Sequence, residues 1–218
     1  MYERSADSRG PAVTAVGGIP LAPGDHICAL HRGREERDRL ITPFFADGLR
    51  EGQTCVFLAP EGEGRAFRDL LATTVPEVRR VCGNLQIKPP EETYLRNGTF
   101  DGDRMLDLLY SWSYRTFSEG DAGFACLAAD MSWARPLVRP AFTAELIRYE
   151  TRATRWLRSY PQVGVCLYDL DTFGGDLIIP LIKAHPRVWL NGMVFENPYC
   201  LGPDEVAGVL GHGTAHVN

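Results

Sequence analysis

The chain has 218 residues, 44% of them apolar, and its formal net charge is −5. That length and apolar content predict one sizeable domain with a hydrophobic core. The net charge is negative, and acidic and basic residues are interspersed along the chain. Nucleic acid or an anionic membrane would therefore not be attracted electrostatically, and direct binding to either is not expected. The six cysteines are scattered and include no Cys-x-x-Cys pair, which indicates buried thiols in a reducing compartment rather than disulfides.

Targeting segments are not evident in the sequence. No apolar run reaches the roughly 20 residues needed to cross a bilayer, and the opening residues MYERSADSRGPAV lack the apolar centre of a secretion signal. We therefore expect a cytoplasmic protein. Residues 1–20, rich in Gly, Pro, Ala and Ser, predict a flexible arm, residues 21–201 the folded domain, and residues 202–218 a tail too short for a helix-turn-helix.

From residue 26 onward, short apolar runs alternate with amphipathic stretches long enough for helices. The apolar runs predict strands at 26–30, 54–59, 85–88, 124–131, 163–170 and 188–197. The amphipathic stretches predict helices at 35–52, 64–75, 101–120, 142–160 and 175–186. Pro43 predicts that the first helix is kinked or begins later. Continuous apolar strands separated by helices predict a three-layer α/β fold, with a mostly parallel sheet covered on both faces.

The loop after the first strand is where such a fold would hold a phosphate. It reads LHRGREERDRL, without the lysine followed by Ser or Thr and without the glycine arch of a phosphate loop, so ordinary ATP hydrolysis is not expected. Arg32 and Arg34, beside the start of a helix, either hold an anion or are solvated. His31 in the same loop is a further candidate ligand contact.

The second strand runs into APEGEGRAF, which contains Gly62-x-Gly64. A dinucleotide site needs a third small residue, and Phe67 stands there instead. Glu61 and Glu63 would also repel a pyrophosphate. A dinucleotide cofactor is therefore not expected, and the sequence identifies no other cofactor.

Polar and aromatic residues follow three later strands. Asp130 either faces a ligand, metal or water, or caps a helix, and Trp133 is either a pocket wall or core. If the strands are parallel, these ends share one rim and could line a pocket with apolar walls. Alternatively, Asp and Asn simply begin turns and Pro ends strands. The residues concerned are Asp130, Ser132, Trp133, Tyr168, Asp169, Asp171, Glu196, Asn197 and Tyr199.

His26 and Cys28 stand two apart in a predicted strand, so their side chains share a face. Zinc needs three or four ligands and this pair supplies two, so we expect no metal, a hydrogen-bonded His26 at the amino edge and Cys28 in the core. His185 is expected to end a helix as a cationic ring. No Gly-x-Ser-x-Gly elbow is present, and no exposed cysteine is predicted beside a histidine, so no catalytic residue is assigned.

Several segments in a fixed order resemble the MEDS family, a sensory domain of methanogens and methylotrophs. They are GDHICALHRGREERDRLITPFFADGLREGQTCVFLAP, YLRNGTFD, DMSWA and HPRVWLNGMVFENPY, and the resemblance extends from about residue 20 to 201. It implies a RecA-like domain, kin to circadian-clock ATPases, that lacks a functional phosphate loop. Asp130 stands where the family usually has Glu. The positions carried over as ligand candidates are His26, Tyr94, Asp130, Trp133, Tyr168, Glu196, Asn197 and Tyr199.

The resemblance implies a sensor of small molecules that is fused to, or encoded beside, regulatory modules. We therefore expect a non-catalytic domain that binds a small, partly apolar ligand at the carboxyl rim, where Trp133, Tyr168 and Tyr199 would favour a planar molecule. Having no visible output module, it would signal through a kinase-like, anti-sigma or DNA-binding partner protein, or through a homodimer. The alternatives are a divergent nucleotide-binding ATPase or transferase, with Asp130 or Glu196 as base, and a pure assembly module.

Overall fold

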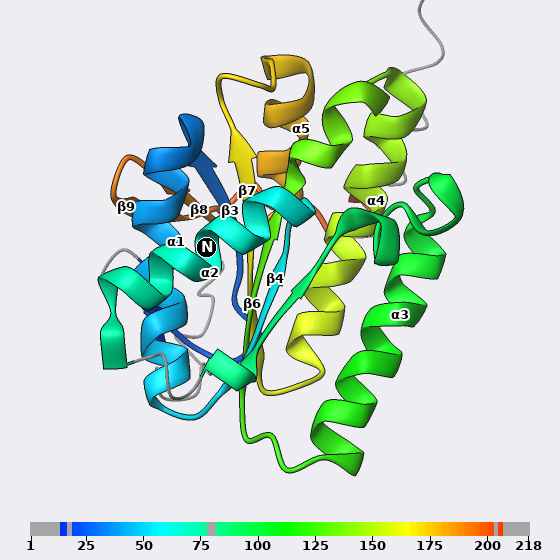
Figure 1. The fold of residues 1–218 in the computed structure, drawn as a ribbon. Helices are drawn as coiled ribbons and strands as arrows, with labels where there is room; N and C mark the ends of the chain where they lie inside the picture. The colour runs from blue at the N-terminus through cyan, green and yellow to red at the C-terminus, as the bar shows by residue number, and fades with distance from the viewer. Residues whose placement is uncertain (1–13, 17–18, 78–81, 203–204, 207–218) are drawn as a thin grey trace, which may run out of the picture.

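The computed structural model describes residues 14–16, 19–77, 82–202 and 205–206. Seven strands form the central sheet: β3 (His26–His31), β4 (Thr54–Leu58), β5 (Leu85–Lys88), β6 (Ala125–Asp130), β7 (Gln162–Asp169), β8 (Arg187–Leu190) and β9 (Met193–Glu196). Their order is β5-β4-β6-β7-β3-β8-β9, and every neighbouring pair is parallel except β8 and β9 (Figure 1). The predicted α/β fold with a mostly parallel sheet is therefore confirmed.

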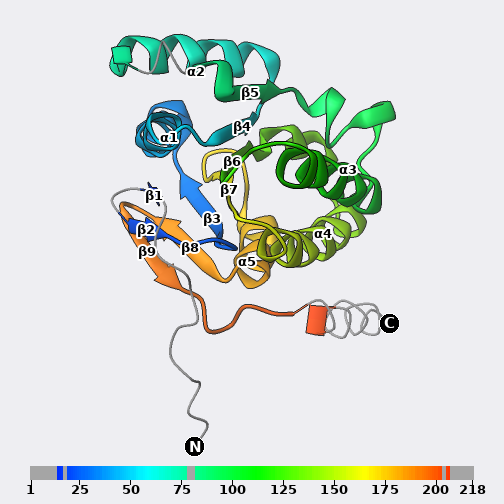
Figure 2. The ribbon, with the colours of Figure 1, turned by 90° about the horizontal axis from the view of Figure 1, so that it is seen from below.

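Helices cover both faces of this sheet. They are α1 (Gly33–Arg50), α2 (Glu61–Thr74), α3 (Gly102–Tyr114), α4 (Pro140–Arg158) and α5 (Gly175–Ala184). Figure 2 shows α1 and α2 on one side of the sheet and α3, α4 and α5 on the other. In the described part of the chain, no helix combines the length and the apolar character needed to cross a membrane.

The inner strand β3 shows why its sequence is apolar between the two histidines at its ends. Cys28 and Leu30 pack toward α3, α4 and α5, whereas Ile27 and Ala29 pack toward α1 and α2. Both faces of the strand are buried, so no polar alternation appears. The prediction that His26 and Cys28 share one face is confirmed, because His26 contacts α4 through Thr154.

The prediction of one strand at 188–197 is wrong. The chain turns at Asn191 and Gly192, whose φ angles are 51° and 79°, and β9 returns antiparallel beside β8. Two consecutive positive φ values are what a tight hairpin turn requires, and Asn-Gly is the pair that adopts them most readily. Residues that follow β9 consequently lie beside the start of β8, at the amino edge of the parallel strands.

The sequence left two possibilities for the first helix, a kink at Pro43 or a later start. α1 starts at Gly33, whose φ of 61° lets the chain turn directly out of β3. The helix then continues through Pro43, whose ring is exposed. A later start after Pro43 is therefore wrong.

The predicted terminal segments are described only in part. Within the expected arm, β1 (Thr14–Val16) and β2 (Ile19–Leu21) pair as an antiparallel ladder, while residues 1–13 lie outside the described residues. Of the expected tail, the structure describes residues 202, 205 and 206. Val206 is buried in a small cluster with Ile147 and Ala184.

Gly64 marks the point where α2 packs on β5. A Cβ atom at Gly64 would lie 2.4 Å from Cγ2 of Ile87, whereas one at Gly62 would meet nothing within 4 Å. We expect Gly64→Ala to lower the free energy of unfolding by about 1–3 kcal/mol, because the helix must move away from the strand. Gly62→Ala, in the same helix, should be neutral or stabilising by up to about 1 kcal/mol. Urea denaturation of both variants tests this, and equal effects would contradict it.

Candidate functional site

At the carboxyl edge of the sheet, Arg37 of α1 is enclosed by carboxylates. Its Nη1 donates to Oδ2 of Asp130 at 2.6 Å, and its Nη2 donates to Asp38 and Glu63 at 2.8 Å each. The side chain is buried, with 3% of the residue exposed. Burial by itself would lower the pKa of Arg37, but the carboxylates, Asp130 foremost, more than offset it, and the pKa is raised. Asp130 is therefore held by a fixed internal cation.

Asp130 has a second contact, which settles one of the alternatives left open by the sequence. Its Oδ1 accepts a hydrogen bond from the backbone N–H of Ser132 at 2.9 Å, at the start of the 3₁₀ segment η6 (Met131–Leu137). The helix-capping interpretation is confirmed. Sequence reasoning missed Arg37, because one arginine in an Arg- and Glu-rich helix start looks like a solvated residue.

The start of α1, where a nucleotide-binding fold holds phosphate, is occupied by carboxylates of the chain itself. The backbone N–H of Gly33 donates to Asp169 at 3.1 Å, and that of Arg32 donates to Glu36 at 2.7 Å. Hydrogen bonds from the backbone of Asp171 and Gly33 outweigh burial and lower the pKa of Asp169. The helix N-terminus thus already has anionic partners.

The candidate residues of this loop face those same carboxylates. The Nη1 of Arg32 donates to Asp171 at 2.7 Å, and Arg34 lies 3.4 Å from Asp38 and 3.5 Å from Glu63. His31 is buried, its Nδ1 lies 3.0 Å from the carbonyl oxygen of Gly33, and burial lowers its pKa. Both arginines are at least half exposed, and each is paired internally.

Tyr94 and Trp133 are brought together in the core. Their rings stack at 4.6 Å, and Phe100, Phe142 and Tyr149 surround the pair. Trp133 is 6% exposed and Tyr94 is 3% exposed. The core interpretation of Trp133 is confirmed.

Glu196, Asn197 and Tyr199 do not join Asp130. Because β9 is antiparallel, they lie at the opposite edge, where Nδ2 of Asn197 donates to the carbonyl oxygens of Ile182 at 2.7 Å and His185 at 2.9 Å. Tyr199 is 78% exposed. The expectation that the ends of all these strands converge on one rim is therefore wrong for the last strand, and the hairpin turn is the reason.

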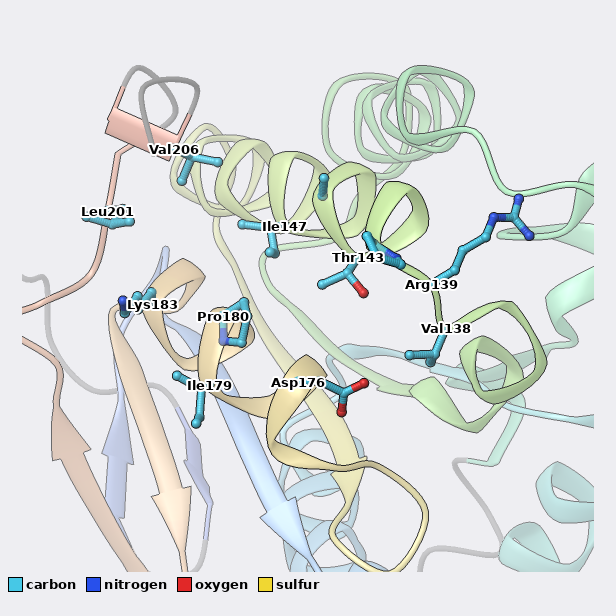
Figure 3. A pocket seen from close by; sticks show the side chains of 12 residues that line it. Val138, Arg139, Thr143, Ile147, Asp176, Ile179, Pro180, Lys183, Leu201 and Val206 are labelled. Atoms are coloured by element: carbon cyan, nitrogen blue, oxygen red, sulfur yellow. The ribbon is translucent and has the colours of Figure 1, made fainter. Parts of the chain in front are cut away.

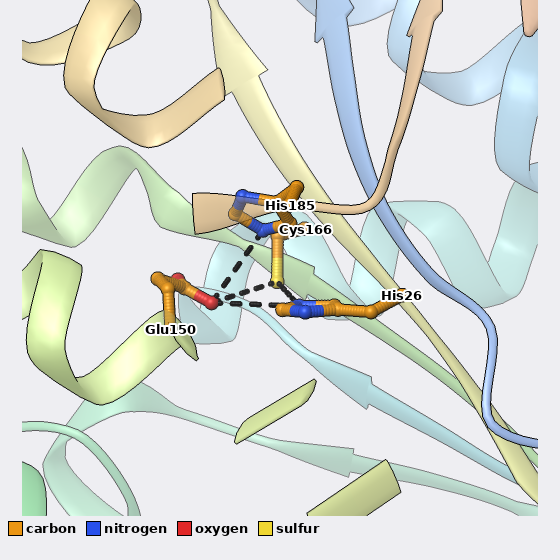
Figure 4. Close-up of side chains that lie close together, drawn as sticks. All are labelled: His26, Glu150, Cys166 and His185. Atoms are coloured by element: carbon orange, nitrogen blue, oxygen red, sulfur yellow. Dashed lines mark hydrogen bonds and ion pairs between the residues drawn. The ribbon is translucent and has the colours of Figure 1, made fainter. Parts of the chain in front are cut away.

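A buried polar cluster lies between the sheet and helices α4 and α5 (Figure 4). It contains His26 from β3, Cys166 from β7, Glu150 from α4 and His185 just after α5. Oε2 of Glu150 lies 3.5 Å from Nε2 of each histidine and 3.7 Å from the Cys166 sulfur, which is 3.4 Å from Nε2 of His26. All four residues are buried. Sequence reasoning missed Glu150, because it is one acidic residue in an amphipathic helix.

The protonation states of His26 and His185 follow from their burial. Burial, with a smaller contribution from Arg158, lowers the pKa of His26 to about 3. Burial, and then His26, lowers the pKa of His185 to about 4, so the expectation of a cationic His185 is wrong. His26 is hydrogen-bonded and Cys28 is in the core, as predicted.

Tyr168 also belongs to this region rather than to the rim. Its hydroxyl donates to Oε1 of Glu150 at 2.7 Å, and the residue is fully buried. Burial raises the pKa of both Tyr168 and Glu150. Tyr168 therefore holds Oε1 of the carboxylate, while Oε2 faces the two histidines.

An internal cavity of about 30 Å³ adjoins the cluster. By the usual requirement of about 10–15 Å³ for one water, it has room for roughly two water-sized groups. His26, Glu150 and Cys166 form its polar wall. The remaining wall is mostly apolar and aromatic, and it contains Leu58, Tyr94, Leu109, Leu127, Ala128, Ala129, Tyr149, Ala153, Trp156, Leu157, Gly164 and Val165.

A larger groove of about 450 Å³ opens to solvent between α3 and the strands β4 and β5. Its interior is apolar, and its mouth carries polar residues such as Lys88, Glu92 and Arg115. Leu58, Leu109 and Leu127 line both the groove and the internal cavity. These leucines lie between the two spaces and form a wall of each, although in the sequence they are indistinguishable from ordinary core residues.

A separate surface hollow of about 380 Å³ lies between α4 and α5 (Figure 3). Ile179 and Pro180 of α5 face Thr143 and Ile147 of α4, and Val206 lies at one end. Its described lining residues include none of the predicted site residues. The hollow is thus distinct from both the groove and the polar cluster.

Comparisons with known proteins agree with the resemblance seen in the sequence. The family model described as MEDS, the methanogen/methylotroph, DcmR sensory domain, matches residues 25–186, which contain the polar cluster, the cavity and the groove. The chain is also 27% identical over 184 residues to the transcriptional repressor DcmR of Methylorubrum extorquens. That alignment covers 84% of this chain and 66% of the relative's length. The chain therefore belongs to the MEDS family of sensory domains.

Proposed function

We propose that this domain is a non-catalytic sensor that binds a small, partly apolar molecule in the groove beside α3 and in the cavity behind it. The observation that supports this best is that Leu58, Leu109 and Leu127 line both spaces. A ligand seated there would bury apolar surface against the leucines and direct a polar atom toward Glu150. Concave apolar sites with a few polar groups are the usual form of small-molecule sites.

The proposed site differs from the rim expected from the sequence. The groove lies toward the carboxyl ends of the edge strand β5 and its neighbour β4, whereas Asp130 is paired with Arg37 and Glu196 lies at the other edge. The proposed RecA-like domain would not bind a triphosphate, because phosphates at the start of α1 would meet the carboxylates of Asp169 and Glu36, which accept hydrogen bonds there.

A regulatory output is proposed from the relative, which is a transcriptional repressor. The chain spans 66% of that relative's length. We propose that this domain supplies sensing and passes the signal to a kinase-like, anti-sigma or DNA-binding partner protein. α3 ends in a π-helical turn (Arg115–Glu119) whose first two residues line the groove mouth. Such turns occur frequently at functional sites, so occupancy of the groove would act on α3. The ligand can shift the domain only by its differential affinity for two states.

Titration with small apolar probes tests the site. Short alcohols, haloalkanes and phenol are added to protein carrying labelled leucine methyl groups, and we expect saturable shifts at Leu58, Leu109 and Leu127. The melting temperature should rise, since a ligand at 100 times its Kd stabilises the folded state by about 2.7 kcal/mol.

Two tryptophan variants distinguish the groove from the other hollow. Leu108→Trp fills the groove from α3, and Ile179→Trp, its control, fills the hollow between α4 and α5. Loss of the probe response in Leu108→Trp alone supports the proposal. An unchanged response in Leu108→Trp, or a loss confined to Ile179→Trp, would place the ligand elsewhere.

A further inference from the structure

We propose that His26, Glu150, Cys166 and His185 bind one zinc ion in the core of this domain. Their four ligand atoms all lie within 4.8 Å of one another and point to a common centre (Figure 4). Four of the six separations, 3.4, 3.5, 3.5 and 3.7 Å, are close to the edges of a tetrahedron, and the two from His185 to His26 and Cys166 are no longer than 4.8 Å. Tetrahedral zinc with bonds of about 2.0–2.3 Å has ligands about 3.3–3.7 Å apart. This inference does not depend on the proposed small-molecule site.

The outer hydrogen bonds direct a lone pair of each histidine toward the centre. His185 Nδ1 lies 2.8 Å from the carbonyl oxygen of Leu181, which can only accept, so Nδ1 carries the proton and Nε2 is the free acceptor. The hydroxyl of Thr154 donates to the carbonyl of Glu150, so it accepts from Nδ1 of His26 at 2.8 Å. A histidine that binds zinc through one ring nitrogen usually donates a hydrogen bond from the other, and this bond fixes the orientation of the ring.

Without a cation, the centre of the cluster has too few hydrogen-bond donors. With Glu150 ionised, two imidazole nitrogens and Oε2 of Glu150 all accept there, and the Cys166 thiol is the one donor that this arrangement supplies. In the described part of the chain, Nε2 of His185 is buried without a hydrogen-bond partner. A metal ion at the centre would satisfy all four atoms at once, because it accepts an electron pair from each of them.

The charge of the cluster also matches zinc. The carboxylate of Glu150 and a Cys166 thiolate would supply two negative charges, and the imidazoles are neutral. A divalent cation makes the site neutral overall, which lowers the cost of burying it. Two nitrogens, one sulfur and one oxygen suit zinc, and four protein ligands leave no open position, so the ion would be structural rather than catalytic.

The ion would connect β3, near the start of the chain, to α4, β7 and the end of α5, which follow one another much later in the sequence. This is why the sequence led us to expect no metal: the only closely spaced pair was His26 and Cys28. Cys28 shares the buried face but is not among the four ligands, which makes it a matched control for Cys166.

Zinc content and cobalt spectroscopy of the full chain test the proposal. We expect roughly one zinc per chain by mass spectrometry in the wild type and in Cys28→Ser, and at least tenfold less in Cys166→Ser and His185→Gln. After replacement of zinc by Co²⁺, the wild type and Cys28→Ser should show the charge-transfer band of a thiolate bound to tetrahedral cobalt. Thr154→Val, which removes an outer hydrogen bond, should weaken the metal affinity about 10–100-fold.

If Cys166→Ser does not fold, the cobalt spectra of the wild type and of Cys28→Ser still identify the sulfur ligand. A thiolate band in the wild type that survives in Cys28→Ser assigns the sulfur ligand by itself. A folded wild type that takes up neither zinc nor cobalt after refolding with either ion would overturn the proposal. Loss of the band in Cys28→Ser, with Cys166→Ser unaffected, would overturn it equally.

Discussion

Replacing Arg37 with methionine is expected to lower the free energy of unfolding by about 3–5 kcal/mol. The guanidinium donates to Asp130, Asp38 and Glu63, and both Arg37 and Asp130 are buried. Methionine replaces the aliphatic part of the arginine side chain but carries no charge, so the carboxylate of Asp130 would remain buried without its cation. Removing one partner of a buried ion pair costs far more than the pair itself contributes. Urea denaturation at neutral pH measures the loss.

Arg34→Met is the matched control for this prediction. Arg34 approaches the same Asp38 and Glu63 from a half-exposed position, where solvent screens the charges. We expect its replacement to cost less than about 1 kcal/mol. If Arg37→Met and Arg34→Met lowered the free energy of unfolding by similar amounts, burial would not be the reason that Arg37 stabilises the protein. Adding Asp130→Asn to Arg37→Met should recover part of the stability, because it removes the unpaired charge.

Trp133→Ala is expected to cost about 3–5 kcal/mol, the loss typical of removing a large buried aromatic ring. The ring stacks on Tyr94 at 4.6 Å and contacts Phe100 and Phe142. In the described part of the chain its Nε1 is buried without a hydrogen-bond partner. Trp133→Phe keeps an aromatic ring in the stack and removes that unpaired N–H group, so it should cost clearly less. Thermal and urea denaturation measure both variants.

Trp112→Ala separates stability from ligand binding. Trp112 lies in the groove and is partly buried, so its removal should cost less stability than that of Trp133 while weakening the response to apolar probes. Trp133→Ala should cost more stability than Trp112→Ala and should weaken the response to apolar probes less. If Trp133→Phe, with its stability nearly intact, lost the probe response while Trp112→Ala kept it, the binding site would lie at the aromatic cluster instead of the groove.

The sequence by itself determined the element types and the class of fold. Apolar runs placed β3, β4, β6 and β7 to within a residue or two, because a strand buried on both faces has no polar alternation. The sequence also placed β5 at 85–88, although this edge strand is buried on one face only. It also predicted that His26 and Cys28 share a face, since that depends only on the two-residue repeat of a strand. The family resemblance was visible in the same way, because it rests on ordered local motifs.

The tertiary structure alone decided which residues meet. Glu150 and Cys166 reach His26 and His185 only because α4 and α5 pack on the same face of the sheet, and no spacing along the chain records that contact. Arg37 became a buried ion-pair partner in the same way. One local turn at Asn191 and Gly192 reversed the last strand and moved Glu196 to the opposite edge. Propensity is a property of neighbouring residues, whereas burial, charge pairing and a common centre for four ligands depend on segments far apart in the chain.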